Sequence, residues 1–433
     1  MLSRNRKLNA VTTMSSFKRF LSLLKSKFLG NDVKLSEDGA KYTIIFSQII
    51  TDIINIWPEK FSTSTTVCFS VTFVICILQE ISLFVFLITS VEDVDSLTKV
   101  LASMSIVLQS MVKGSTFYYK AEEMNEVIKI IRHEFWPSNI MGKDLDCKIR
   151  GNSKILLSVL LVQYVFAVAF LLFYVILPLI QGTKQLPHTS WYPFDWSATP
   201  AYEILYCLQA YITVYFNENV VCAYDSLYCS ICANCVAQFR LLSEAVKHIG
   251  TGREDEIAGS LLKIPGVNYR ATLNVEDYDE RRLLVICIRH HQKLIEVTDQ
   301  LNKIFGNGHL VQVFASVLGS CTSIYRITTK NGLNDLTFLI SYYMAHVVQL
   351  FEYCALSNEL SYWSTCLSVT AFQCFWYRKK YSDIRGCLSL VIMRSQRSIS
   401  MNGLGLFELD YVFFMSVMRF TFSLYTFLSR FTE

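Results

Sequence analysis

Residues 155–183 read ILLSVLLVQYVFAVAFLLFYVILPLIQGT, a run of 29 residues without a charged side chain. A helix of about 20 apolar residues crosses the hydrocarbon core of a bilayer, whereas a buried helix of a soluble core typically has about 10–14 such residues. The run is therefore long enough to span a membrane. It predicts an all-α membrane protein, and the other apolar runs of the chain extend this prediction.

The composition also favours a membrane protein. Hydrophobic residues make up 52% of the chain and charged residues 18%, whereas soluble proteins average about a quarter charged residues. The net charge of +4 is small and the basic residues are scattered among apolar runs, so we expect no nucleic-acid partner. No phosphate-binding loop, dinucleotide-binding glycine motif or His-Glu-x-x-His motif occurs. We expect neither an enzyme nor a metal or other cofactor.

Two further runs are nearly free of charge, since 61–79 has none and 304–325 has only His309 as an ionisable group. Four weaker runs reach spanning length only if a charge at their edge, such as Lys113 or Glu352, snorkels to the surface or lies inside a helix bundle. The sequence therefore predicts seven transmembrane helices, at about 61–89, 97–118, 155–181, 201–224, 304–325, 336–362 and 408–429.

Lys and Arg are distributed unevenly between the segments that connect these spans. The connecting segments of one side carry 32 of the 40 basic residues, and those of the other side carry four. Basic residues near spans mark the cytoplasmic side. We predict a cytoplasmic N-terminus and, with seven spans, an extracellular C-terminus. The predicted parts are the cytoplasmic N-terminal segment 1–60 and the seven-transmembrane domain 61–429, with cytoplasmic segments at 240–303 and 378–397.

The first 41 residues carry nine Lys or Arg, and apolar residues recur among them at helical spacing from Phe17 to Phe28. This pattern is typical of a basic helix on an anionic membrane surface. A disordered basic tail has the same composition, and both interpretations stand.

Aromatic side chains concentrate in the predicted outer halves of several spans. Cavities for small ligands are mostly apolar and aromatic, with a few polar groups that orient the ligand. Packing against lipid and neighbouring helices accounts for many residues of this kind as well. The predicted ligand-binding residues are Phe166, Phe170, Phe173, Tyr174, Tyr202, Tyr206, Phe338, Tyr342 and His346.

The segment between the third and fourth spans contains WYPFDW at 191–196, with Pro187 and Pro200 at its ends. Prolines stiffen such a loop and aromatic rings cover an apolar opening, which favours a lid over a ligand pocket. An ordinary aromatic belt at the membrane interface explains the same residues. The final span is rich in hydroxyl groups, as expected for a helix that faces water or another helix.

The predicted orientation disfavours a G-protein-coupled receptor, which has an extracellular N-terminus. No Asp-Arg-Tyr ends a third span, no Asn-Pro-x-x-Tyr occurs in the last, and no proline follows Pro265. Transporters commonly contain inverted repeats and paired helices broken by Gly or Pro, and neither pattern is evident here.

At three places the chain resembles the insect odorant receptors. The resemblance lies in Trp57-Pro58 before the first span, in the 186–202 loop with its Pro200-Ala201-Tyr202-Glu203 end, and in Trp376-Tyr377, Arg394-Ser395-Gln396 and Phe420–Leu428. Length and topology agree, so the resemblance covers essentially the whole chain. The final span departs from the gustatory receptors at Ser423-Leu424-Tyr425, and from the co-receptor at Phe427-Leu428-Ser429-Arg430. This is the pattern of a ligand-specific tuning subunit.

The resemblance implies a subunit of a ligand-gated, non-selective cation channel, assembled as a heterotetramer with an odorant receptor co-receptor. It implies a small volatile odorant as ligand and, as location, the plasma membrane of olfactory sensory neurons, with membrane lipid around the spans. It also implies that 378–397 forms a helix of a cytoplasmic anchor region and that the seventh spans line a pore. The pore residues expected on this basis are Tyr425, Phe427, Leu428 and Arg430. A gustatory-type chemoreceptor and a G-protein-coupled receptor are the alternatives.

Overall fold

The computed structural model describes residues 42–60, 63–89, 94–264, 282–329, 333–375, 377 and 385–430. These residues belong to one compact unit, Gly39–Glu433. They are helical apart from turns and one isolated bridge between Asn402 and Glu408. The predicted basic helix or tail within 1–41 lies outside the described residues, as do Trp376 and the start of the predicted 378–397 helix.

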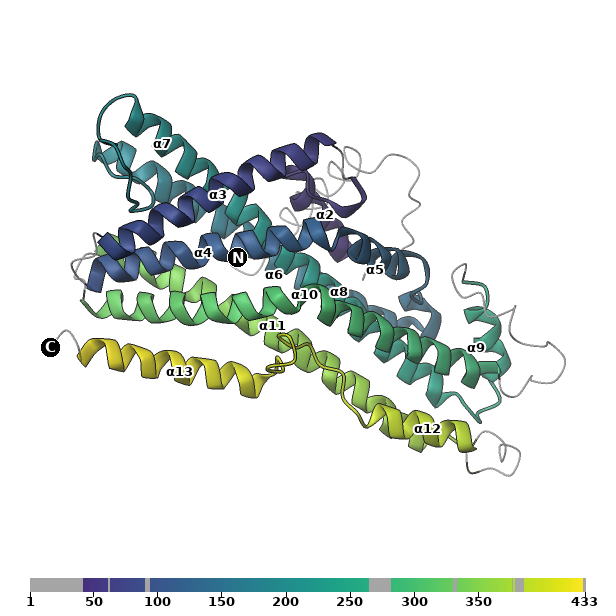
Figure 1. The fold of residues 1–433 in the computed structure, drawn as a ribbon. Coiled ribbons are helices and arrows are strands. Elements are labelled where there is room, and N and C mark those ends of the chain that lie inside the picture. The colour runs from purple at the N-terminus through teal and green to yellow at the C-terminus, as the bar shows by residue number, and fades with distance from the viewer. Residues whose placement is uncertain are drawn as a thin grey trace, which may run out of the picture. The chain divides into compact units, whose positions relative to one another are not determined.

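Each of the seven predicted spans overlaps a helix of the described residues, although 61–62 lie outside them and the last helix begins at Tyr411 and not at 408 (Figure 1). In chain order the helices are α3 (Thr63–Thr89), α4 (Val94–Tyr119), α6 (Lys143–Gln181), α7 (Ala201–Ala210) with its continuation, α10 (Arg282–Thr329), α11 (Leu333–Gln373) and α13 (Tyr411–Arg430). The continuation of α7 is a π-helical segment, η3 (Tyr211–Asn217), followed by α8 (Glu218–Lys247).

Length and apolar composition suffice for a membrane crossing in five of these described helical runs: α3, α6, α7 to α8, α10 and α13. The structure therefore confirms an all-α membrane protein. Helices α4 and α11 are long but less apolar, and each carries charged residues within the predicted span. The count of seven spans and the sidedness of the termini stay predictions.

Two of the apolar helical runs, α6 and the run of α7 to α8, differ strongly in burial. In α6 only 6% of the most apolar window is buried inside the protein, whereas in the run of α7 to α8 the figure is 78%. Val162 and Ile180 of α6 are 67% and 75% exposed. A soluble protein rarely exposes an apolar stripe of this length, so α6 presents its surface to lipid and α8 forms the core.

Helices α8, α10 and α11 are each longer than a membrane is thick. They have 30, 48 and 41 residues, and 30 residues already span about 45 Å. Their far halves pack together beyond the predicted membrane region, with α9 (Glu254–Leu261) on α10 and α12 (Arg385–Ser395) on α11 (Figure 1). The predicted helix at 378–397 is described only as α12, because 378–384 lie outside the described residues.

The N-terminal segment contains a helix that we did not predict. Helix α2 (Tyr42–Ile53) packs against α8 and buries Ile44 and Ile50. Trp57 follows it and is 1% exposed. The residues at 44, 47 and 50 recur at helical spacing, so the signal was present in the sequence but shorter than a span. The described part of segment 1–60 is therefore a packed element of the helical bundle.

Another short helix, α5 (Ala121–His133), follows α4 and buries its apolar face, including Met124 and Ile131. The remaining short elements are η1 (Pro58–Lys60) and η2 (Ser138–Met141).

The turn between α12 and α13 is built around glycine. Gly405 has a φ of +75°, a conformation that favours glycine. A Cβ atom on Gly403 would lie 2.2 Å from Cζ of Phe407, so no larger residue fits there without a shift.

This turn is held by two long helices. The Asn302 side chain of α10 donates to the Ser400 carbonyl at 3.1 Å and accepts from the Asn402 amide at 2.9 Å. The Met401 amide donates to Oγ of Ser357 on α11, also at 2.9 Å. The start of α13 is therefore fastened to both α10 and α11.

Candidate functional site

A cavity of about 450 Å³ lies between α2, α4, α6, η3, α8 and α11. Four of the nine predicted ligand-binding residues line it: Phe166 and Phe170 from α6, and Tyr342 and His346 from α11. Its volume is in the range of about 300–1,000 Å³ that is usual for small-molecule sites. Segments more than 170 residues apart in the chain thus supply the aromatic wall of one cavity.

Two of the other predicted residues pack against this aromatic wall without lining the cavity themselves. The ring of Phe338 stacks on Phe170 and on Tyr174, with centroids 4.7 and 4.9 Å apart. Neither Phe338 nor Tyr174 lines the cavity. Offset-stacked aromatic rings are held in place by their neighbours, so this pair fixes the position of the Phe170 ring.

The remaining three lie elsewhere. Tyr202 and Tyr206 form a separate cluster with Val175, whose carbonyl accepts a hydrogen bond from the Tyr206 hydroxyl. Phe173 is 61% exposed on the surface of α6. The structure does not bring these three residues to the cavity.

The cavity also has a polar region that the sequence analysis missed. Glu218, Asp225 and Glu352 line it, together with the amides of Gln163 and Gln349. Charged residues in the middle of predicted spans are costly and are usually retained for function. In the sequence Glu352 marks the edge of an apolar run, and a charge at that place is itself a signal of a polar site.

Asp225 is held by a buried network. Lys113 of α4 is fully buried, and its Nζ donates to Oδ1 of Asp225 at 2.5 Å and to Oε1 of Gln312 at 2.7 Å. The Tyr353 hydroxyl donates to the same Asp225 oxygen, and Gln349 donates to the other. The sequence analysis expected Lys113 either to snorkel to the surface or to lie inside the helix bundle, and in the structure it lies inside the bundle. The pair compensates both charges in a low-dielectric interior.

Four buried polar atoms of residues that line the cavity have no hydrogen-bond partner among the described residues. They are Nδ2 of Asn217, Oη of Tyr342, Nδ1 of His346 and Oε1 of Glu352. Asn217 is 1% exposed and His346 is 5% exposed. Because buried polar groups are almost always paired, such atoms lining a cavity are available to a ligand.

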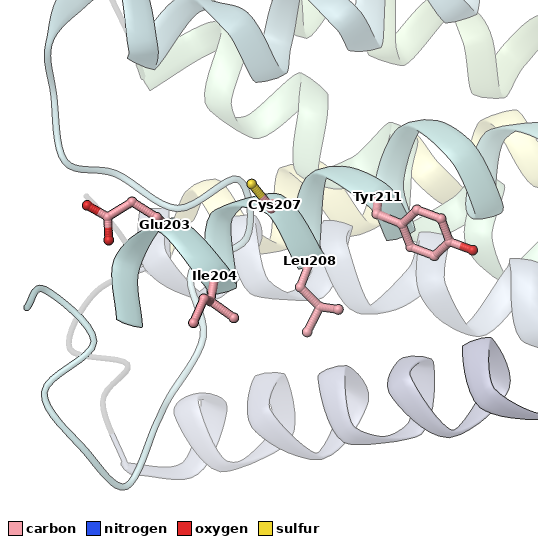
Figure 2. Close-up of a pocket in the computed structure, with 5 residues that line it drawn as sticks. All are labelled: Glu203, Ile204, Cys207, Leu208 and Tyr211. Carbon is pink, nitrogen blue, oxygen red and sulfur yellow. The ribbon is translucent and has the colours of Figure 1, made fainter. Parts of the chain in front are cut away.

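A second, shallow pocket lies on the outside of α7. Figure 2 shows its five lining residues, Glu203, Ile204, Cys207, Leu208 and Tyr211, along one stretch of helix. Their side chains are exposed, and Ile204 is 62% exposed. The stripe at 204, 208 and 211 is apolar and open, which suits contact with lipid tails more than enclosure of a small molecule.

The loop at 186–200 is tied to α3 and α7. The backbone amide of His188 donates to Oε1 of Gln209 at 2.8 Å, and its ring lies 2.8 Å from the Thr213 hydroxyl. Burial lowers the pKa of His188 to about 4, so the ring is neutral at physiological pH. On α3, Gln79 donates to Oγ of Ser190 at 2.7 Å. No residue of the loop lines the 450 Å³ cavity, so the loop covers these helix ends and is not a lid on that cavity.

The model of the 7tm Odorant receptor family matches residues 93–422. Odorant receptor 85c of Drosophila melanogaster is 21% identical over 318 residues, which cover 70% of this chain and 75% of that protein. The Odorant receptor coreceptor of Anopheles gambiae is 19% identical over 290 residues, which cover 54% of this chain and 60% of that protein.

The structure of the insect olfactory receptor OR5 from Machilis hrabei in complex with eugenol has the same fold. It matches with a TM-score of 0.69 and 15% identity, over 91% of this chain and 100% of that chain. The family match covers most of the present sequence, and it sets aside the gustatory and G-protein-coupled alternatives. The chain belongs to the 7tm Odorant receptor family, and it is a multi-pass membrane receptor and not an enzyme.

Proposed function

We propose that this chain is the odorant-binding subunit of a ligand-gated, non-selective cation channel, which acts with an odorant receptor co-receptor in the plasma membrane of olfactory sensory neurons. The cavity of about 450 Å³, with aromatic walls and unpaired polar atoms, is the observation that carries the proposal. The Machilis receptor, which shares the fold, was solved with the small molecule eugenol. The charge asymmetry of the sequence supports seven spans with a cytoplasmic N-terminus.

The exposed surface of α13 supports an assembly around this helix. Phe427 is 59% exposed and Arg430 is exposed. Only 11% of the most apolar window of α13 is buried within the chain. We propose that Tyr425, Phe427, Leu428 and Arg430 line a central pore, where an apolar ring closes the path by dewetting and a cationic ring opposes cation passage.

The experiment that tests this function is current recording in cells that express the chain alone, the co-receptor alone, or both, across an odorant panel. We expect an odorant-specific current only when both are present, because four Arg430 side chains at one mouth would repel cations and mixed assembly dilutes that charge. The Arg430→Gln variant should change permeation in the mixed channel and leave the ranking of odorants intact. A robust odorant-evoked current from the chain alone would refute the dependence on a co-receptor.

Truncating the aromatic wall should weaken odorant sensitivity. Phe170→Ala and Tyr342→Ala remove contacts worth roughly 1–3 kcal/mol each, and should raise the half-maximal odorant concentration about tenfold. Tyr362→Ala is the matched control, because Tyr362 lies on the same helix as Tyr342 but is 55% exposed and outside the cavity. Surface labelling confirms delivery of each variant.

Tyr206→Ala decides between the two aromatic clusters. A large loss of sensitivity in Tyr206→Ala, with none in the two cavity variants, would move the ligand site to the cluster around Tyr202 and Val175.

A further inference from the structure

The lining of the cavity is unbalanced in charge. Three carboxylates line it, those of Glu218, Asp225 and Glu352, and none of its lining residues is Lys or Arg. Along α11 the cavity runs from Ile340 to Glu352, which is about 18 Å at the rise of an α-helix. The carboxylate of Glu352 therefore lies at one end and the aromatic wall extends toward the other.

Only one of the three carboxylates has a cationic partner among the described residues that contact it. Asp225 is compensated by Lys113 and receives hydrogen bonds at both oxygens. Glu218 accepts a hydrogen bond from the Cys222 thiol, which is a weak donor, at 2.9 Å. An additional positive charge in the cavity would therefore be attracted.

The geometry favours an organic cation over a metal ion. Within the described ranges, no group of three or more His, Cys, Asp or Glu side chains is placed to hold a metal. Aromatic rings such as Phe170 and Tyr342 line the same cavity as the carboxylates. Aromatic faces attract organic ammonium groups and pack against their hydrocarbon parts. The unpartnered Nδ1 of His346, which is nearly fully buried, indicates that a polar ligand group belongs there.

We propose that this cavity selects small organic amines. The ammonium group donates hydrogen bonds to Glu352, whose Oε1 has no partner among the described residues, and the charges of Glu218 and Asp225 add attraction. The hydrocarbon part packs against Phe170 and Tyr342. This assignment rests on the proposed odorant-receptor function and adds the chemical class of the ligand.

Three probes of nearly equal size and shape test the proposal: phenethylamine, phenethyl alcohol and propylbenzene. They are applied to cells that express the full chain with the co-receptor, and the evoked current is recorded. We expect phenethylamine to act at a concentration roughly tenfold or more below the other two, because a charge-assisted hydrogen bond replaces a neutral one or none. Glu352→Gln should remove this preference, and Glu218→Gln should reduce it.

The control is Glu359→Gln, the same chemical change on the same helix at an exposed residue outside the cavity. It should retain the preference for the amine. If neutral odorants evoke current while phenethylamine and a series of small alkyl amines do not, the amine assignment is overturned and the proposed receptor function stands. An amine preference that survives in both Glu352→Gln and Glu218→Gln at normal surface level overturns the assignment as well. If neither amines nor neutral odorants evoke current, both proposals fail.

Discussion

Replacing Lys113 with methionine is expected to prevent delivery of the receptor to the cell surface. Lys113 is fully buried, and its Nζ lies 2.5 Å from Oδ1 of Asp225. Methionine fills a similar volume but leaves the Asp225 carboxylate without its counter-charge in a low-dielectric interior. Breaking one side of a buried pair costs about 3–5 kcal/mol, which is a large part of the roughly 5–15 kcal/mol that stabilises a typical fold. Surface biotinylation and thermal unfolding in detergent measure the effect.

Two variants make this prediction specific. Lys113→Met combined with Asp225→Asn should recover much of the lost surface level, since no unpaired charge remains. Lys99→Met removes a cation from the same helix, but Lys99 pairs with Asp95 at a partly exposed site with 38% of its side chain accessible. Such a pair contributes less than about 1 kcal/mol, so that variant should behave like the unmodified receptor. Normal surface level and stability in Lys113→Met would show that Asp225 does not depend on this cation.

Replacing Gly308 with alanine is expected to destabilise the bundle by roughly 1–3 kcal/mol, the usual cost of overpacking. A Cβ atom at Gly308 on α10 would lie 2.0 Å from Oη of Tyr224 and 2.5 Å from its Cζ. Tyr224 is fully buried and donates to the Phe305 carbonyl at 3.2 Å, so its ring has little room to retreat. A lowered unfolding temperature in detergent checks the expectation.

Gly151→Ala is the matched control, because that glycine is also helical and has nothing within 4 Å of the added Cβ atom. Alanine is favoured over glycine in a helix interior by about 1 kcal/mol, so this variant should be unchanged or slightly more stable. Both substitutions replace glycine with alanine, but Gly308→Ala is expected to lower the stability and Gly151→Ala to leave it unchanged or raise it slightly. Equal unfolding temperatures for both would mean that α10 and α8 separate at this crossing.

The membrane helices could be predicted from the sequence because each needs only a local apolar run. The uncharged residues at 155–183 became the outer part of α6, and six other runs also lie on helices. The contact of Lys113 with Asp225 could not be predicted in this way, since the two residues are separated by 112 positions and each is simply a charge in an apolar context. Pairing of distant residues depends on how helices cross, and periodicity does not report it.

The cavity was predicted in part. Phe170 and Tyr342 were found because aromatic residues in outer halves are typical of ligand sites. Tyr206 was assigned to the same site, but the π-helical segment Tyr211–Asn217 follows it, and Thr213 and Asn217 of that segment line the cavity instead. A π-segment inserts an extra residue into a turn and rotates the two flanking faces relative to each other. A sequence search that assumes 3.6 residues per turn therefore assigns residues on the two sides of this segment to the wrong faces of the helix.

Because the 399–402 turn is hydrogen-bonded to α11, a displacement of α11 would be transmitted to this turn. Between Glu352 at the cavity and Ser357 at the turn, α11 is continuous α-helix without proline or glycine, so it has no hinge to absorb a tilt. A ligand that draws the cavity wall inward would therefore carry Ser357 with it. Through the Met401 amide, the base of α13 would follow. The hydrogen bond of Ser357 thus lies about one and a half helical turns from Glu352, on the segment that leads into α13.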